Sequence, residues 1–288
     1  MGISSALGPA REVRLSAGRV RYHETGSGTP VVFVHGLLVN ADLWREVVPA
    51  LAAAGHRCLA PDWPLGAHSI PLPDADLTPT GLADLIAEFL DVLDLTEVTI
   101  VANDTGGALT QLLMTRRPER IARVVLAAVD CYEVFPPAPF AAVMPAAGFP
   151  GVLRAALASM RWRPIRQSRL GFGWVVKHPL PQEIMDSYLL PARRSAAIRA
   201  DLRRFAVGVD NRDTLAAAEK FGSVEIPVLV VWPTEDKLFP MELAHRLVHD
   251  LPRATLKTVE DSYTLLPEDR PELLAELIVE FTRLHAAP

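Results

Sequence analysis

The stretch Val98-Thr99-Ile100-Val101-Ala102-Asn103-Asp104-Thr105-Gly106-Gly107-Ala108-Leu109 decides the fold. Its β-branched beginning is typical of a strand, and the residues after the glycine pair favour a helix. A strand that turns directly into a helix, with small residues on both sides of one polar residue, is a nucleophile-elbow arrangement. The turn strains the backbone of Asp104 and holds its side chain at the N-terminus of the helix, where an anion is favoured.

An aspartate in this turn predicts attack on an alkyl carbon rather than acyl transfer. The alternative is that Asp104 only caps the following helix. A cap does not require small neighbours on both sides, whereas Ala102, Gly106 and Gly107 surround Asp104. We therefore expect Asp104 to be the reactive centre.

Strands and helices alternate on both sides of this stretch. Segments 11–15 and 20–24 predict a hairpin, and the apolar run 31–34 predicts a strand that is buried on both faces. Such alternation predicts an α/β fold with a mostly parallel sheet flanked by helices. Further strands are expected at 58–60, 98–101, 124–129, 228–232 and 254–258, and helices at about 41–54, 79–93, 241–250 and 270–284.

The alternation stops after Asp130 and resumes at Val228. Between these points, 135–165 is rich in Pro and Ala, and 168–213 predicts short helices without a strand. We therefore expect residues 131–215 to form an inserted helical cap. Residues 1–130 and 216–288 would then form one core.

Composition narrows the class of protein. The chain has 288 residues, a net charge of -5 and 50 % hydrophobic residues, so it can bury a large core but has no basic patch for nucleic acid or a membrane. Cys58 and Cys131 show no disulfide or metal spacing, and the N-terminus has no leader pattern. These features predict a cytoplasmic monomer or homodimer that needs no metal or organic cofactor.

The chain resembles the α/β-hydrolase superfamily, and within it the haloalkane dehalogenases and epoxide hydrolases with an aspartate nucleophile. The resemblance rests on the order and spacing of the Asp104 elbow and four other segments. These are His35-Gly36, the loop Asp62–Ser69, the loop around Asp236, and the closing segment Pro267–Phe281.

The resemblance implies roles for several of these residues. The backbone N–H groups of Leu37 and Thr105 would form an oxyanion hole, and His35 would support the loop that carries Leu37. Asp236 would be the orienting acid, with Glu235 as the alternative. Both carboxylates could instead be solvated loop residues.

The chain departs from the family pattern where the catalytic histidine is expected. Counting back from Glu268, Asp269 and Pro271 puts Thr264 at that position, with Tyr263 beside it, and there is no histidine between His249 and His285. Haloalkane dehalogenases also usually carry a Trp after the nucleophile and often an Asn after His-Gly. Here those positions hold Thr105 and Leu37, so a halide site of the usual kind is not expected.

Other residues are candidates for the roles that the missing histidine leaves open. His68 could serve as the base, or could be a loop histidine that bonds the backbone. Tyr188 or Tyr132 could donate a proton to an epoxide oxygen, or could be packing residues. Asp130 and Glu133 could line the pocket or form surface pairs.

We expect an apolar pocket over Asp104 and a hydrolase that acts on a small apolar alkyl halide, epoxide or ester through an Asp104 ester. One alternative is a lyase, cyclase or isomerase in which Asp104 is an acid or base. Another is a catalytically silent protein that binds a small molecule. The pocket residues expected from the cap are Phe140, Met144, Phe149, Leu153, Phe172 and Trp174.

Overall fold

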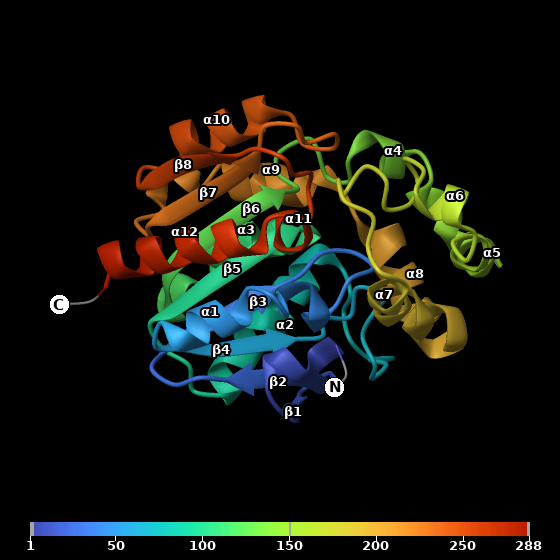
Figure 1. Cartoon of the computed structure of the whole chain (residues 1–288), viewed down its shortest axis with the longest axis horizontal. Coiled ribbons are helices and arrows are strands. Elements are labelled where there is room, and N and C mark those ends of the chain that lie inside the picture. The colour runs from blue at the N-terminus through green and yellow to red at the C-terminus, as the bar shows by residue number, and fades with distance from the viewer. Residues whose placement is uncertain (1–2, 150, 287–288) are drawn as a thin grey trace.

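A computed structural model describes residues 3–149 and 151–286 of the chain. Eight strands form one sheet in the order β1-β2-β4-β3-β5-β6-β7-β8 (Figure 1). The hairpin β1–β2 joins the sheet antiparallel to β4, and the six strands from β3 to β8 are parallel to one another. The predicted α/β-hydrolase fold is thus confirmed. The strands are β1 Ala10–Leu15, β2 Gly18–Thr25, β3 Thr29–Val34, β4 His56–Pro61, β5 Val98–Asp104, β6 Ile121–Val129, β7 Val228–Pro233 and β8 Ala254–Val259.

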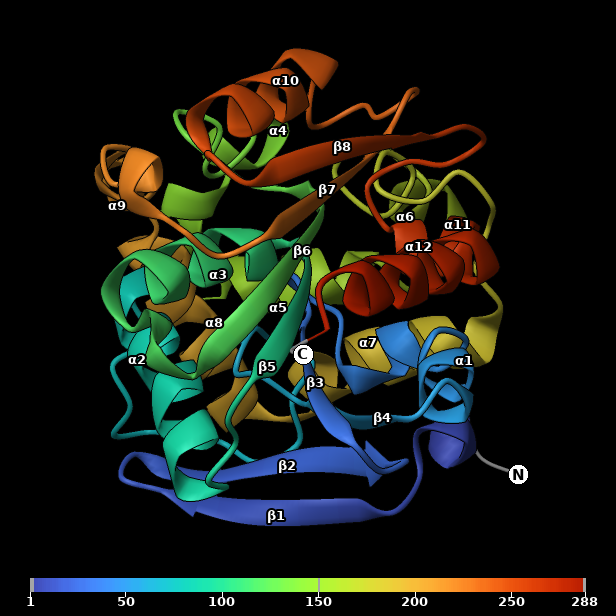
Figure 2. The ribbon, with the colours of Figure 1, turned by 90° about the vertical axis from the view of Figure 1, so that its left-hand side faces the viewer.

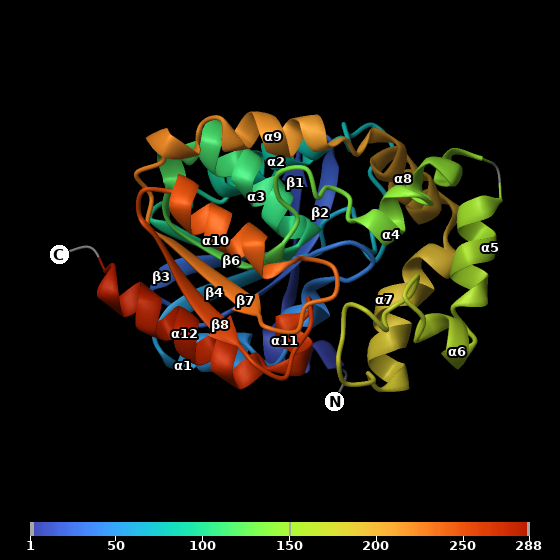
Figure 3. The same cartoon turned by 90° about the horizontal axis from the view of Figure 1, so that it is seen from above.

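Helices cover both faces of the sheet, as Figures 2 and 3 show. Helices α1 and α12 pack together on one face, while α2, α3, α9 and α10 lie on the other. This covering is why β3 and β5 read as continuous apolar runs in the sequence. The helices of the core are α1 Val48–Ala53, α2 Pro79–Val92, α3 Thr105–Arg116, α9 Asn211–Ala218, α10 Met241–Asp250, α11 Leu266–Asp269 and α12 Pro271–Leu284.

The predicted helix over 41–54 is interrupted. A 3₁₀ helix covers Ala41–Trp44, and the α-helix begins only at Val48. Pro49 explains the break, because proline has no backbone N–H to donate and is tolerated only in the first turn of a helix.

The residues between β6 and β7, 130–227, are called here the inter-strand segment. Its described residues form helices and one isolated bridge between Cys131 and Val134, and they add no strand to the sheet. Its helices α4 to α8 group beside the carboxyl ends of the strands (Figure 1). Helix α9 crosses the predicted boundary at residue 215 and packs against α3 of the core. The remaining helices are α4 Ala138–Ala141, α5 Val152–Ser159, α6 Arg163–Arg166, α7 Gln182–Arg194 and α8 Ala196–Gly208.

Short 3₁₀ helices complete the connections. Within the described ranges, no helix has both the length and the apolar character that crossing a membrane would need. The 3₁₀ helices are η1 Ile3–Leu7, η2 Ala41–Trp44, η3 Pro118–Arg120, η4 Met144–Gly148 and η5 Phe221–Ser223.

Candidate active site

Asp104 lies in a strained turn between β5 and α3. Its backbone dihedral angles are φ 55° and ψ -132°, a conformation that residues other than glycine rarely adopt. Two glycines make this turn possible. A Cβ atom on Gly36 would lie 2.0 Å from Asp104 Oδ2, and one on Gly107 would lie 2.1 Å from a methyl group of Val129. The absence of a side chain at these two glycines therefore leaves room for the Asp104 carboxylate and for the Val129 side chain beside the turn.

Backbone amides hold the carboxylate of Asp104. The N–H of Leu37 donates to Oδ2 at 3.1 Å, and the N–H of Thr105 also bonds the carboxylate. Burial nevertheless raises the pKa of Asp104 to about 6, because these two amides offset only part of the cost of removing the charge from water. The group expected to be reactive is thus a poorly solvated carboxylate aimed at a pocket.

A cavity of about 640 Å³, its mouth included, lies over Asp104. Its lining comes from the loop after β3, the ends of β5 and β6, the inter-strand segment and the loop after β8. Among the lining residues, only Asp104, Thr105 and Asp130 carry polar side chains. The other lining residues are Leu37, Leu38, Phe135, Pro136, Pro137, Phe140, Met144, Met160, Leu170, Gly171, Phe172, Val175, Phe205 and Leu265.

Asp130 was one of two acidic residues whose placement the sequence left open. It follows β6, is 1 % exposed, and accepts a hydrogen bond from Thr105 Oγ1 at its Oδ2 (3.0 Å). Burial raises its pKa well above the usual carboxyl value, and the negative charge of Asp104 raises it further. Glu133, the other residue, is exposed and pairs with Arg246 on the surface.

Asp236 and Thr264 contact each other beyond the end of β7. Oδ1 of Asp236 accepts the hydroxyl of Thr264 at 3.0 Å and two backbone N–H groups, from Leu238 and Phe239. Oδ2 is buried and has no partner among the described residues. Burial raises the pKa of Asp236 to about 6, and the charge of Asp104 adds to this rise. Neither Asp236 nor Thr264 lines the cavity.

His35 braces the loop that carries Leu37. It is fully buried, its Nδ1 bonds the carbonyl of Gly36 at 2.9 Å, and its Nε2 accepts the N–H of Trp63 at 2.9 Å. Burial lowers the pKa of His35 to about 4, so the ring is neutral at physiological pH. This arrangement fixes where the Leu37 amide points.

His68 is held away from the cavity. Its Nε2 bonds Asp201 Oδ2 of α8 at 3.0 Å, and its Nδ1 accepts the N–H of Gly66 at 3.3 Å. Both ring nitrogens are therefore occupied, and His68 is not among the cavity residues. Asp201 has no sequence motif around it, and its bond makes this histidine a link between the loop after β4 and the inter-strand segment.

The tyrosines proposed as proton donors also lie outside the cavity lining. Tyr188 is buried behind Phe172, stacks on its ring, and donates its hydroxyl to Glu268. Tyr132 donates to Asp250 at 2.9 Å. Tyr263 lies under the ammonium of Lys237, 4.0 Å from the ring centre.

The expected apolar pocket residues divide into two groups. Phe140, Met144 and Phe172 line the cavity. Phe149, Leu153 and Trp174 do not, and the side chain of Phe149 is 68 % exposed. Apolar composition alone could not separate the two groups, because short helices without a clear stripe leave their orientation undetermined.

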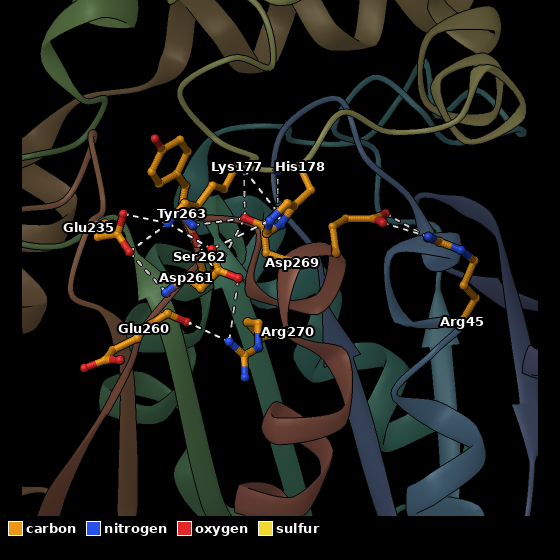
Figure 4. A network of polar contacts seen from close by, with 11 residues as sticks. Arg45, Lys177, His178, Glu235, Glu260, Asp261, Ser262, Tyr263, Asp269 and Arg270 are labelled. Carbon is orange, nitrogen blue, oxygen red and sulfur yellow. Dashed lines mark hydrogen bonds and ion pairs between the residues drawn. The ribbon is translucent and has the colours of Figure 1, made fainter.

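Asp269, which in the sequence only marks the register of the last loop, is the centre of a polar network (Figure 4). Its carboxylate accepts the backbone N–H groups of Lys177, His178 and Tyr263 at 2.9–3.1 Å. It therefore ties the inter-strand segment to the loop that carries Thr264. Asn103 has a related role, because its Nδ2 donates to the carbonyl of Thr264 at 2.7 Å.

The fold, the elbow and the apolar cavity over an amide-held carboxylate are those of an α/β hydrolase. The chain belongs to this family, since the family model described as "alpha/beta hydrolase fold" matches residues 29–271.

Several hydrolases are similar to the chain over nearly its full length. The uncharacterized hydrolase YugF of Bacillus subtilis is 27 % identical over 96 % of this chain and 99 % of its own. The haloalkane dehalogenase DatA from Agrobacterium tumefaciens C58 superposes with a TM-score of 0.80 at 23 % identity, covering 98 % of this chain and 99 % of its own. The epoxide hydrolase CorEH superposes with a TM-score of 0.76 at 20 % identity, covering 96 % and 99 %. At these identities, the two solved structures support the fold alone.

Proposed function

We propose that this hydrolase acts on a small apolar molecule through covalent attack by Asp104 on an alkyl carbon. The observation that carries the proposal is the position of the Asp104 carboxylate: it faces an apolar cavity while a backbone amide holds one of its two oxygens. A carboxylate with few compensating partners is a better nucleophile than a well-solvated one.

The hydrogen bond from Leu37 suits both steps of such a reaction. Attack through Oδ1 forms an ester between Asp104 and the substrate, and Oδ2 becomes its carbonyl oxygen. When water attacks that ester, negative charge develops on Oδ2, which the amide of Leu37 stabilises, and the neighbouring amide of Thr105 also favours a negative charge on Asp104. The same two amides thus act as the oxyanion hole that the family resemblance implies.

The contact between Thr264 and Asp236 fits the proposed departure from the usual triad. A hydroxyl reaches the carboxylate that would otherwise orient a histidine. A threonine hydroxyl cannot accept a proton from water at neutral pH, so Thr264 cannot replace the histidine as a base. The water-activating base must therefore come from elsewhere in the site.

The test is intact-protein mass spectrometry after exposure to hexyl bromide and to the epoxide of hexene. We expect an adduct on the peptide that contains Asp104, and none in Asp104→Asn, whose amide has nearly the same shape but is a poor nucleophile. Turnover in heavy-oxygen water should also place solvent oxygen in Asp104.

Two other outcomes would replace the proposal. Product formation without an adduct and without solvent oxygen would favour a lyase, cyclase or isomerase in which Asp104 is an acid or base. The pair of carboxyls in the cavity is the observation that favours this second candidate. Tight reversible binding without product would indicate a binding protein.

A further inference from the structure

Asp130 is a second carboxyl in the cavity, with a fixed position and one unused oxygen. The backbone N–H of Asp130 donates to the carbonyl of Asp104 at 3.3 Å. The backbone carbonyl of Asp130 accepts Gln111 Nε2 at 2.8 Å. Its Oδ2 accepts the hydroxyl of Thr105. Its Oδ1 is buried and has no hydrogen-bond partner among the described residues. A buried polar atom without a partner is costly to keep unless a ligand or a reaction uses it.

The two carboxyls of the cavity cannot both be charged at low cost. Burial and the charge of Asp104 raise the pKa of Asp130, and the Thr105 hydroxyl lowers it; among the described residues no cation forms an ion pair with Asp130. Two like charges in an apolar site favour a state in which one group keeps its proton. Of the two, Asp104 has the backbone amides that stabilise an anion, so Asp130 keeps the proton. Because Thr105 donates to Oδ2, that proton lies on Oδ1.

We infer that Asp130 is the general acid of this site, and that the substrate is an epoxide or a similarly strained cyclic ether, an inference that rests on the proposed attack by Asp104. An alkyl halide needs a donor for its departing anion but no proton. The cavity lining has no side-chain N–H group among its residues, and its unused donor is a carboxylic acid. A carboxylic acid suits a leaving oxygen that must become a hydroxyl.

The first step balances with these two residues. An oxygen of Asp104 forms a bond to one ring carbon, and the bond between that carbon and the ring oxygen breaks. The electron pair of that bond passes to the oxygen, which takes the proton of Asp130. The products are a hydroxyalkyl ester of Asp104 and the carboxylate of Asp130.

The second step needs a base, and the first step has just produced one. Esterification removes the charge of Asp104, so the carboxylate of Asp130 no longer faces a like charge. Water attacks the ester carbonyl and gives one proton to Asp130. The second proton of that water passes to the departing alkoxide oxygen, so the diol leaves as Asp104 regains its charge. An acid that becomes the base of the following step is familiar from retaining glycosidases. Asp130 thereby supplies the base that Thr264 cannot provide.

The test compares two probes of equal chain length in wild type and in Asp130→Asn. Hexyl bromide alkylates Asp104 without proton transfer, whereas the epoxide of hexene needs an acid. We expect Asp130→Asn to slow adduct formation from the epoxide by about 10²–10⁴-fold, the usual worth of general acid catalysis. Alkylation by hexyl bromide should stay within a few-fold of wild type, which also shows that the variant is folded. The bromide adduct should then persist longer than in wild type.

The possible results separate this inference from the proposed function. An equal loss with both probes would mean that Asp130 only shapes the environment of Asp104, and an unchanged epoxide rate would mean that it donates no proton; either overturns the inference and leaves Asp104 as the nucleophile. Absence from wild type of adducts with both probes, and of solvent oxygen in Asp104 after exposure to either, would instead refute the attack by Asp104, and this inference with it.

Discussion

Two groups of carboxylates, one in the network of Figure 4 and one in the cavity over Asp104, differ in how many partners they have. In the network of Figure 4, Glu235 and Asp261 both bind the ammonium of Lys177 at 2.7–2.9 Å, and Asp269 accepts three backbone N–H groups. In the cavity, Asp104 has two backbone amides and Asp130 has one hydroxyl.

The difference shows in the pKa values. The ammonium of Lys177 lowers the pKa of Glu235 and of Asp261, whereas burial raises the pKa of Asp104 and of Asp130. Compensated carboxylates stabilise the structure and resist a change of charge. Poorly compensated ones cost stability but can attack, donate and accept protons. Asp269 thus ties the inter-strand segment to the core, whereas Asp104 and Asp130 have the few partners that the proposed function requires.

The largest effect is expected from restoring a histidine at position 264. In Asp130→Asn, the hexyl bromide adduct on Asp104 should decay slowly. Adding Thr264→His should speed that decay by about 10²–10⁴-fold, since Asp236 already bonds the side chain at this position and can orient an imidazole. Adduct decay is followed by intact mass, with Thr264→Asn as the control. Unchanged decay in a folded double variant would show that no base is missing.

The compensated group should respond in stability rather than in rate. Asp269→Asn places an amide group against three N–H donors, and we expect it to lower the free energy of unfolding by about 2–4 kcal/mol. Asp261→Asn is the matched control, because its side chain is 51 % exposed and its ion pairs are at the surface. That control should have a much smaller effect, because exposed ion pairs contribute little to stability. Equal losses in urea titrations would mean that the three N–H groups around Asp269 stabilise the protein no more than the surface ion pairs of Asp261.

The cavity carboxylate should show the opposite sign. The pKa of Asp104 is raised from 3.8 to about 6 by folding, so the folded protein binds the extra proton more tightly and loses stability as pH rises through this window. At pH 7 the charge is fully present, and Asp104→Asn should raise the free energy of unfolding by about 1–3 kcal/mol. Near pH 4 the gain should vanish. A destabilised variant at pH 7 would mean that the charge of Asp104 is compensated.

The smallest effect is a pH profile that distinguishes the two probes. The charge of Asp104 raises the pKa of Asp130 and of Asp236, and the charge of Asp130 raises the pKa of the adjoining Cys131. Alkylation by hexyl bromide requires ionised Asp104, so its rate should rise about tenfold between pH 5 and pH 7 and then level off. The epoxide reaction should rise likewise but fall at higher pH, where Asp130 loses its proton. Identical profiles would argue against an acid role for Asp130.

Local patterns were sufficient for the core of the fold. The apolar run 31–34 is a strand buried on both faces, and the helix expected at 241–250 is α10, Met241–Asp250. The turn at Asp104 was predictable because its constraint is local: only small neighbours allow such a turn. The register of the last loop, counted back from Glu268, Asp269 and Pro271, put Thr264 at the position of the missing histidine, and the structure brings its hydroxyl against Asp236.

The partners of the side chains were not readable. Nothing near His68 in the sequence points to Asp201, and nothing near Tyr188 points to Glu268, because each pair is brought together by the packing of the inter-strand segment on the core. The same packing turns Phe140 into the cavity and leaves Phe149 exposed.

The sequence by itself determined the order of strands and helices, the elbow, and which residue stands at its centre, since these depend on neighbouring residues and on periodicity. Only the tertiary structure decided that Asp130 lies beside Asp104 with an unused oxygen. The physical reason is that burial and charge coupling depend on groups distant in the chain, and they determine which carboxyl carries the proton.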